Sequence, residues 1–176
     1  YDWLTAKMWV READAQVHQV VSRHLMTHLF MEAICVATHR HLPAVHPVYK
    51  LLLPHLRYTL AVNVLGRDCM YPAEDGLFEK YLAIGCHYED LTKEAYIKFT
   101  LDDLHVEKDL QSREVGDAEA LPNYHYREDA LLLWKVIKKF VRTGIFLHYW
   151  TPENINNDEE LHSWIFDIYS MGMPVY

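Results

Sequence analysis

The sequence is poor in cysteine and has an excess of acidic over basic residues. Its three cysteines, Cys35, Cys69 and Cys86, form no CxxC pair, so we expect reduced thiols and a cytoplasmic protein. Lysine and arginine number 17 against 25 aspartates and glutamates, which gives a formal net charge of −8 at pH 7. Because phosphate binding needs a concentrated basic surface, we expect no nucleic-acid partner.

Long hydrophobic runs are missing as well. No run approaches the roughly 18 to 20 apolar residues of a membrane-spanning helix, which leaves peripheral membrane association as the kind of membrane contact to consider. There is no P-loop, GxGxxG or Ser-His-Asp signature, so the corresponding enzyme classes gain no support. The chain opens with Tyr1, and we expect it to be a piece of a longer protein. Its aromatic content of 13% predicts a large exposed apolar patch if the chain is alone, and hence either a partner that covers the patch or aggregation.

Histidine, in contrast, is concentrated in one stretch. Seven of the 12 histidines lie between positions 18 and 55, in an otherwise apolar, helix-forming sequence. Histidine is the commonest transition-metal ligand, so this density suggests a metal site. The seven are His18, His24, His28, His39, His41, His46 and His55.

Spacing decides which of these side chains can converge. On a regular helix each residue turns about 100°, so His24 and His28 diverge by only about 40° and can share one ion. His18 and His28 are separated by two to three turns, which excludes chelation of one ion by these two residues. For His39, His41, His46 and His55, structural roles in a hydrogen-bonded helical core are favoured over metal binding.

Four stretches of the sequence match a known family: WVREADAQVH, HLMTHL, LPAVHPVYKLLLPHLRYTLAVN and LPNYHYREDALLLW. In these stretches the chain resembles the animal lipoxygenases, the non-haem iron dioxygenases of polyunsaturated fatty acids. The family separates five histidines by four, four, seventeen and eight residues. His18, His28, His46 and His55 fall on the first, third, fourth and fifth places, and Arg23 occupies the second.

The exception at Arg23 matters, because the resemblance implies that the second and third places are iron ligands. His28 matches a ligand, whereas the arginine is permanently cationic and has no lone pair for iron. Ligands five residues apart would diverge by about 140° on a regular helix, so the family pattern needs a π-bulge. If that bulge were absent here, His24 and His28 would form the converging pair. The alternative is a site without iron.

Further roles follow only from the resemblance. His18 supports the iron helix, and Gln19 matches a glutamine near the metal and the substrate channel, although a plain polar helix position explains it equally well. The substrate pocket is implied to include Ala15, Gly66 and Met70, with Gly66 at the position that is associated with oxygen stereochemistry. Gly66 also fits an ordinary C-terminal helix cap. Some relatives carry a basic residue for the fatty-acid carboxylate at the position of Leu65, and Arg57 or Arg67 are the candidates to replace it.

The expected fold is mainly α: a multi-helical fragment of the lipoxygenase catalytic domain, covering residues 1–176, around one long central helix. Helical periodicity runs from Trp9 to His41 and stops before Pro43. A second helix is expected from Pro47, with a break near residues 51–53 before Pro54 and a continuation from Tyr58.

The later part of the chain is less informative. We expect a short helix within residues 74–85, a strand or irregular lid over 95–104, and a polar connector over 104–120. A long helix from about Arg127 to Tyr149 should bury a stripe, and Asn157 or Asp158 should cap a final helix. The stripe consists of Trp134, Ile137, Val141, Ile145 and His148.

Two functions of different kinds remain open. The resemblance implies iron that cycles between ferrous and ferric states and abstracts hydrogen from a bis-allylic carbon before O₂ adds, which yields hydroperoxides. The remaining iron ligands and a lipid-binding β-sandwich are expected outside residues 1–176, so this chain alone should be inactive and should bind the remaining lipoxygenase segments. The alternative is a catalytically dead lipoxygenase-like scaffold or interaction module that holds no iron, which Arg23 favours. The two functions predict different iron contents, so a measurement of bound iron would distinguish them.

Overall fold

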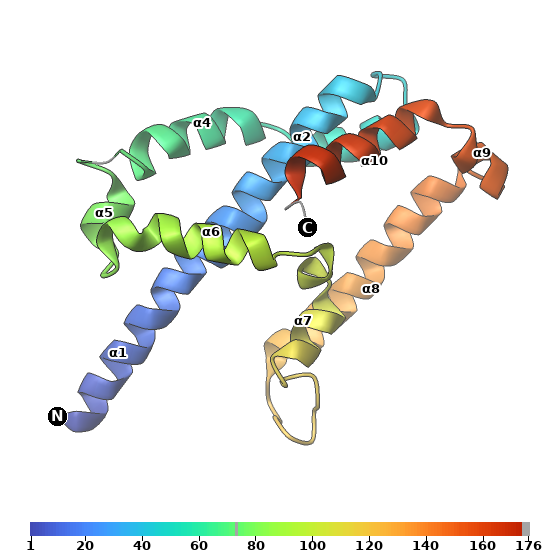
Figure 1. Ribbon diagram of the computed structural model, residues 1–176. Coiled ribbons are helices and arrows are strands. Elements are labelled where there is room, and N and C mark those ends of the chain that lie inside the picture. Colours follow the sequence, from blue (N-terminus) through green and yellow to red (C-terminus); the bar gives the residue numbers. More distant parts are fainter. Residues whose placement is uncertain (73, 174–176) are drawn as a thin grey trace.

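The computed structural model describes residues 1–72 and 74–173, and within these residues it contains helices and no strand, which confirms the expected mainly α fold (Figure 1). No helix in the described ranges has both the length and the apolar character needed to cross a membrane. The elements are α1 Asp2–Val17, η1 His18–Leu29, α2 Phe30–His41, α3 Pro47–Leu52, η2 Leu53–His55, α4 Thr59–Met70, α5 Leu77–Tyr81, η3 Gly85–His87, α6 Tyr88–Lys98, η4 Leu101–Leu104, α7 Val106–Ser112, α8 His125–Phe146, α9 Pro152–Asn156 and α10 Glu159–Gly172.

One continuous rod, formed by α1, η1 and α2, runs diagonally through the structure (Figure 1). Its middle section η1 is a π-helix, and both of its ends continue in α-helical conformation. The rod stops where Leu42 takes an extended conformation, with φ −100° and ψ 117°, before Pro43. Proline disfavours the helical conformation in the residue before it, so the predicted end of the long helix is confirmed.

The prolines also set the boundaries of the next helices. Pro47 opens α3, and the His46 side chain caps that helix by accepting a hydrogen bond from the Val48 backbone N–H. The predicted break at Pro54 is present as the short 3₁₀-helix η2. α4 then runs on to Met70, so Gly66 lies inside the helix and the suggestion that it is a C-terminal cap is wrong.

Two predictions for the middle of the chain are wrong. Residues 95–104, expected as a strand or lid, form the end of α6 and the 3₁₀-helix η4. α6 begins earlier, at Tyr88, and ends before Phe99, which takes an extended conformation. Both side chains are buried, and Phe99 packs on Phe30 with ring centroids 5.1 Å apart. The polar connector contains helix α7, in which Leu110 is buried with 2% of its surface exposed.

The core lies where the π-helix meets α5 and α6. Val20 of η1 is fully buried and packs with Phe78 and Tyr88. Partly buried apolar side chains surround these three, among them Met70 and Tyr71 at the end of α4. A buried apolar cluster therefore lies at the middle of the rod, and the candidate site is built beside it.

α10 lies along α2 and is held by close packing and polar contacts (Figure 1). The Trp164 indole N–H donates a 3.0 Å hydrogen bond to the Thr38 hydroxyl, and Arg40 pairs with Asp167 at 2.9 Å. A Cβ on Gly172 would lie 2.7 Å from the Cβ of Ala33. This approach of the two helices therefore requires glycine at position 172.

A hydrogen-bonded group joins three segments at the other end of α10. The Tyr149 hydroxyl donates to an Asp158 carboxylate oxygen at 2.5 Å, and the buried His46 Nε2 lies 3.1 Å from the same oxygen. Asp158 also caps α10 by accepting from the Leu161 N–H, as predicted. His46 therefore has the structural role that was expected of it.

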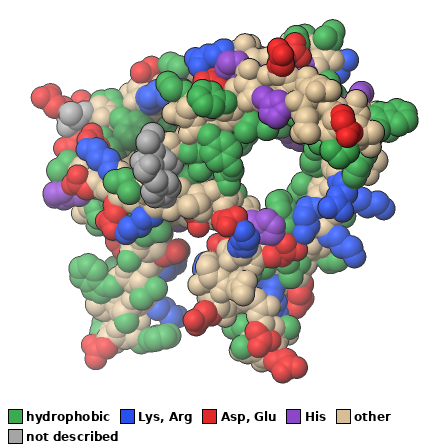
Figure 2. Space-filling view, turned by 45° about the vertical axis from the view of Figure 1, so that its right-hand side comes forward, with side chains coloured by type: hydrophobic (Ala, Val, Ile, Leu, Met, Phe, Trp, Pro, Cys, Tyr) green, Lys and Arg blue, Asp and Glu red, His purple; other side chains and the backbone are tan. Residues whose placement is uncertain are grey.

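α8 packs against α7 near its beginning and against α3 near its end. Its predicted buried stripe is wrong for this chain, because Ile137 and Ile145 are 42% and 36% exposed. α1 is likewise exposed, including Trp3 and Trp9. Figure 2 shows hydrophobic side chains spread over this face, including the projecting arm of α1. The predicted exposed apolar surface is confirmed; the partner that would cover it stays a prediction.

Candidate metal and substrate site

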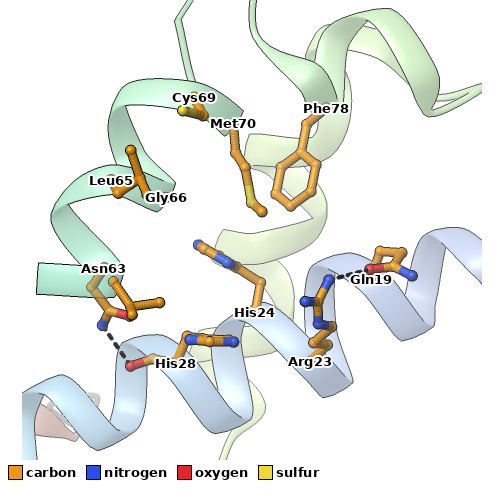
Figure 3. Close-up of a pocket in the computed structure, with 11 residues that line it drawn as sticks. Gln19, Arg23, His24, His28, Asn63, Leu65, Gly66, Cys69, Met70 and Phe78 are labelled. Atoms are coloured by element: carbon orange, nitrogen blue, oxygen red, sulfur yellow. Dashed lines mark hydrogen bonds between the residues drawn. The ribbon is translucent and has the colours of Figure 1, made fainter. Parts of the chain in front are cut away.

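The candidate site is a cavity of about 240 Å³ between the π-helix and α4, closed at one end by α5 (Figure 3). Apolar side chains form most of its wall, and the polar groups come mainly from the π-helix. The lining residues are Gln19, Arg23, His24, His28, Val62, Asn63, Leu65, Gly66, Cys69, Met70 and Phe78.

The π-helix explains why so many polar side chains of one helix share one wall. Arg23 and His28 are five residues apart and would diverge by about 140° on an α-helix. The wider turn of η1, with its i to i+5 hydrogen bonds, brings both to the cavity. The bulge is therefore present. Nevertheless His24 and His28 stay together, with ring centroids 6.0 Å apart and an interplanar angle of 28°.

His24 has an apolar, aromatic environment. Its ring makes edge contacts with Tyr71 and Phe78, at centroid distances of 5.0 and 5.5 Å, and only 5% of the residue is exposed. Burial, followed by the nearby His28 and Arg23, lowers the pKa of His24 to about 4. Its imidazole is therefore neutral at pH 7, and its buried Nε2 has no hydrogen-bond partner among the described residues. Figure 3 shows the ring pointing from the π-helix into the space below α4.

His28 is half-buried and is fixed through its backbone. Asn63 of α4 donates a 2.8 Å hydrogen bond to the His28 carbonyl oxygen and another of 2.8 Å to Glu32. Arg67 donates to both carboxylate oxygens of Glu32, at 2.6 and 2.9 Å. This ion pair holds the pKa of Glu32 below its usual value. The network therefore connects the His28 turn of the π-helix to α4.

Arg23 lies beside His24 on the cavity wall (Figure 3). It donates a 3.2 Å hydrogen bond to the Gln19 side-chain oxygen. No carboxylate of the described residues forms an ion pair with it. A permanent positive charge therefore stands next to the two imidazoles.

The donor chemistry of the cavity fits part of an iron site. Non-haem iron favours imidazole and carboxylate ligands, and a neutral imidazole with an unpartnered buried nitrogen is such a donor. His24 meets that condition, and His28 lies next to it. No aspartate or glutamate of the described residues lines the cavity. The site can thus supply two nitrogen ligands, with Arg23 as an unfavourable neighbour of a cation.

Most of the side chains that the sequence predicted for the site lie at this cavity. His24, His28, Gln19 and the cationic Arg23 come from η1, and Gly66 and Met70 come from α4. Ala15 and His18 do not line it and are exposed. Sequence reasoning missed Asn63, Cys69 and Phe78, together with the Glu32–Arg67 pair. A polar Asn63 between Val62 and Val64 in a helix of apolar residues was the available signal.

The histidines outside the cavity have other roles. His46 is buried, whereas His39 and His55 are exposed, so a buried core role is wrong for those two. His41 is partly exposed and lies 3.0 Å from an Asp167 carboxylate oxygen. His46, Asp158 and Glu160 place potential metal-ligand atoms within 4.8 Å of one another. However, His46 Nδ1 accepts from a backbone N–H, so Nε2 carries the hydrogen that faces Asp158 and offers no lone pair to a metal.

Comparison with known proteins decides the ancestry. The family model described as Lipoxygenase matches residues 1–174. The chain belongs to the lipoxygenase family.

Individual members of the lipoxygenase family give the extent of the similarity. The polyunsaturated fatty acid lipoxygenase ALOX15B of Rattus norvegicus is 36% identical over 98% of this chain and 25% of its own length. The hydroperoxide isomerase ALOXE3 of Rattus norvegicus is 41% identical over 97% of this chain and 24% of its own length. The crystal structure of a coral 8R-lipoxygenase superposes with a TM-score of 0.90 and 34% identity, over 99% of this chain and 26% of the coral chain. This chain thus spans about a quarter of the length of these relatives.

Proposed function

We propose that the complete protein carrying this chain dioxygenates polyunsaturated fatty acids, and that His24 and His28 are two of its iron ligands. The observation that carries the proposal is the neutral, buried His24 ring with an unpartnered Nε2, stacked beside His28 in an apolar cavity. The remaining ligands would come from outside this chain.

When bound, non-haem iron supplies the redox chemistry that removes hydrogen from a bis-allylic carbon before O₂ adds. The residues of this chain that line the cavity would shape the binding site for the substrate. Met70, Leu65 and Phe78 exclude water and contact the hydrocarbon. Gly66 leaves open space, because a Cβ there would meet no atom within 4 Å. Asn63 fixes the backbone that carries His28.

The test is the iron content and the oxygen uptake of the complete protein with linoleate or arachidonate. We expect about one iron per protein, and a His28→Ala variant that loses both iron and oxygen uptake. A wild-type protein with neither iron nor oxygen uptake would contradict the proposal.

A second candidate function is that of a scaffold or interaction module: a catalytically inactive member of the lipoxygenase family that does not dioxygenate fatty acids. Arg23 favours it, because a guanidinium occupies the place of a ligand and repels a metal cation at short range. The same measurement separates the two candidates, since this one predicts a folded protein without iron.

A further inference from the structure

Cys69 is a free thiol on the wall of the cavity, and the iron proposal does not use it. Its side chain is exposed, and the chain offers two other cysteines for comparison. Cys86 is also exposed but lies on η3, outside the cavity. Cys35 is buried, and burial, followed by the nearby Glu32 carboxylate, raises the pKa of its thiol. Of the three, Cys69 alone combines an accessible sulfur with a place in the cavity.

A second group on the same wall is a hydrogen-bond acceptor without a donor. The amide nitrogen of Asn63 donates to the His28 carbonyl oxygen and to Glu32, which fixes the orientation of the amide. The remaining atom, Oδ1, is buried and has no partner among the described residues. Figure 3 shows the Asn63 side chain reaching from α4 toward the π-helix, the opposite wall of the cavity. Because a buried acceptor without a donor costs free energy, a ligand that brings an O–H group is favoured here.

The space between these two groups is open. Asn63, Gly66 and Cys69 follow one another along α4 at three-residue steps, and all three line the cavity. A Cβ on Gly66 would meet no atom within 4 Å. The apolar side chains of Leu65 and Met70 belong to the same part of the wall. α4 therefore offers an acceptor, a gap and a sulfur nucleophile beside a surface that suits a hydrocarbon chain.

We propose that this wall binds a fatty-acid hydroperoxide and that the thiol of Cys69 reduces it. The proposal rests on the proposed function for the class of ligand, because dioxygenation yields a hydroperoxide, and it adds the residue that reacts with this product. A hydroperoxyl group carries an O–H that Asn63 Oδ1 can accept, whereas the unsaturated chain of the substrate carries none. It also carries an O–O bond, which a cysteine sulfur attacks.

The step is a two-electron transfer from sulfur to peroxide. The Cys69 sulfur attacks the terminal peroxide oxygen, so that an S–O bond forms and the O–O bond breaks. The proton of the thiol goes to the oxygen that stays on the carbon chain. Sulfur is thereby oxidised from a thiol to a sulfenic acid, and the hydroperoxide is reduced to an alcohol. Both electrons come from sulfur, so the step needs no other reactant.

The test supplies linoleate hydroperoxide to the complete protein in the presence of dimedone, which traps sulfenic acids, and locates the label by mass spectrometry. tert-Butyl hydroperoxide, which has no long chain, is the comparison reagent. We expect linoleate hydroperoxide to label Cys69 about tenfold more than Cys86, because binding in the cavity raises the concentration of peroxide at Cys69. tert-Butyl hydroperoxide should label the two exposed thiols to a similar extent.

Protection by saturated ligands tests the role of the Asn63 acceptor. Stearate and 12-hydroxystearate contain no double bond and no peroxide, so they occupy the cavity without reacting. Both should protect Cys69 from linoleate hydroperoxide and leave the labelling of Cys86 unchanged. 12-Hydroxystearate should protect at about threefold lower concentration, as one added hydrogen bond allows. Equal potency of the two ligands would overturn the role of Asn63.

Cys69→Ser and Cys86→Ser are the matched variants, because each removes one exposed thiol. Cys69→Ser should abolish the labelling that depends on the long chain, and Cys86→Ser should retain it. Equal labelling of Cys69 and Cys86 by linoleate hydroperoxide, labelling of neither, or labelling of Cys69 that stearate leaves unchanged would overturn the proposal. The hydroperoxide is supplied from outside, so these results do not depend on dioxygenation. Iron content and oxygen uptake judge the proposed function separately, and the two proposals can fail independently.

Discussion

Asn63 donates a hydrogen bond of 2.8 Å to the carbonyl oxygen of His28. Through this bond, α4 holds the turn of the π-helix that presents the imidazole, and Asn63 itself is only 2% exposed. A widened helical turn rearranges the regular backbone hydrogen bonds, so a partner on another element is the kind of support that such a turn needs.

Replacing this amide tests how much the support contributes. Asn63→Leu keeps the approximate volume but removes the side-chain donor to the His28 carbonyl oxygen and one of the two donors to a Glu32 carboxylate oxygen, which keeps its hydrogen bond from Arg67. We expect a loss of about 1–3 kcal/mol in the free energy of unfolding, measured by urea titration. Asn156→Leu, at an exposed position of α9, is the control and should change stability by less than about 0.5 kcal/mol. Equal stability of the Asn63 variant and the wild type would show that the bond contributes nothing.

The Glu32–Arg67 pair should make stability depend on pH. The hydrogen bonds from Arg67 and then Asn63 lower the pKa of Glu32 from its usual 4.5, against the opposing effect of burial. A lowered pKa in the folded state means that the contribution is fully present above pH 4.5 and is lost as the pH falls through the folded value. Glu32→Gln should therefore reduce stability by about 1 kcal/mol at pH 7.

The measurement is urea unfolding of Glu32→Gln and the wild type between pH 7 and pH 3. The difference between the two proteins should become smaller as the pH falls below 4.5, because the wild type then carries a protonated Glu32 as well. A difference that stays constant or grows toward pH 3 would contradict the assignment.

Glycines 66 and 172 should respond in opposite ways to the same change. At Gly66, inside α4, a methyl group meets no atom within 4 Å. Gly66→Ala should stabilise the protein by about 0.5–1 kcal/mol through helix propensity, while it reduces the cavity. Gly172→Ala would place its Cβ 2.7 Å from the Ala33 Cβ and should destabilise the protein by about 1–3 kcal/mol. Thermal or urea unfolding of both variants measures the change in the free energy of unfolding. A change of the same sign in both variants would contradict the prediction.

The sequence predicted the long helix and its proline-defined boundaries because these depend on local rules. The run from Trp9 to His41 has a strong helical period, and Pro43, Pro47 and Pro54 act on their immediate neighbours. The helix of residues 88–98 was missed because Tyr88 is its one buried residue, so its sequence carries no strong apolar period, and Tyr88 is buried through tertiary packing with Val20 of the rod and Phe78.

The site was predicted in part for the same reason. Histidine spacing and the resemblance pointed to His24, His28, Arg23 and Gly66, which all line the cavity. The roles of Asn63 and the other residues of α4 depend on how two helices meet, which no local pattern encodes. The stripe on α8 shows the limit of periodicity: an apolar face predicts burial only where another element covers it.

The central claim is that His24 and His28 hold iron in the complete protein, and metal analysis of matched histidine variants tests it most directly. The comparison uses the wild type, His24→Ala, His28→Ala and His18→Ala, each purified after folding with ferrous iron. His18 lies on the same π-helix but is exposed and outside the cavity, which makes it the control. The account predicts about one iron per protein in the wild type and in His18→Ala, and almost none in His24→Ala and His28→Ala. Iron retained by His24→Ala, or absent from the wild type, would contradict it.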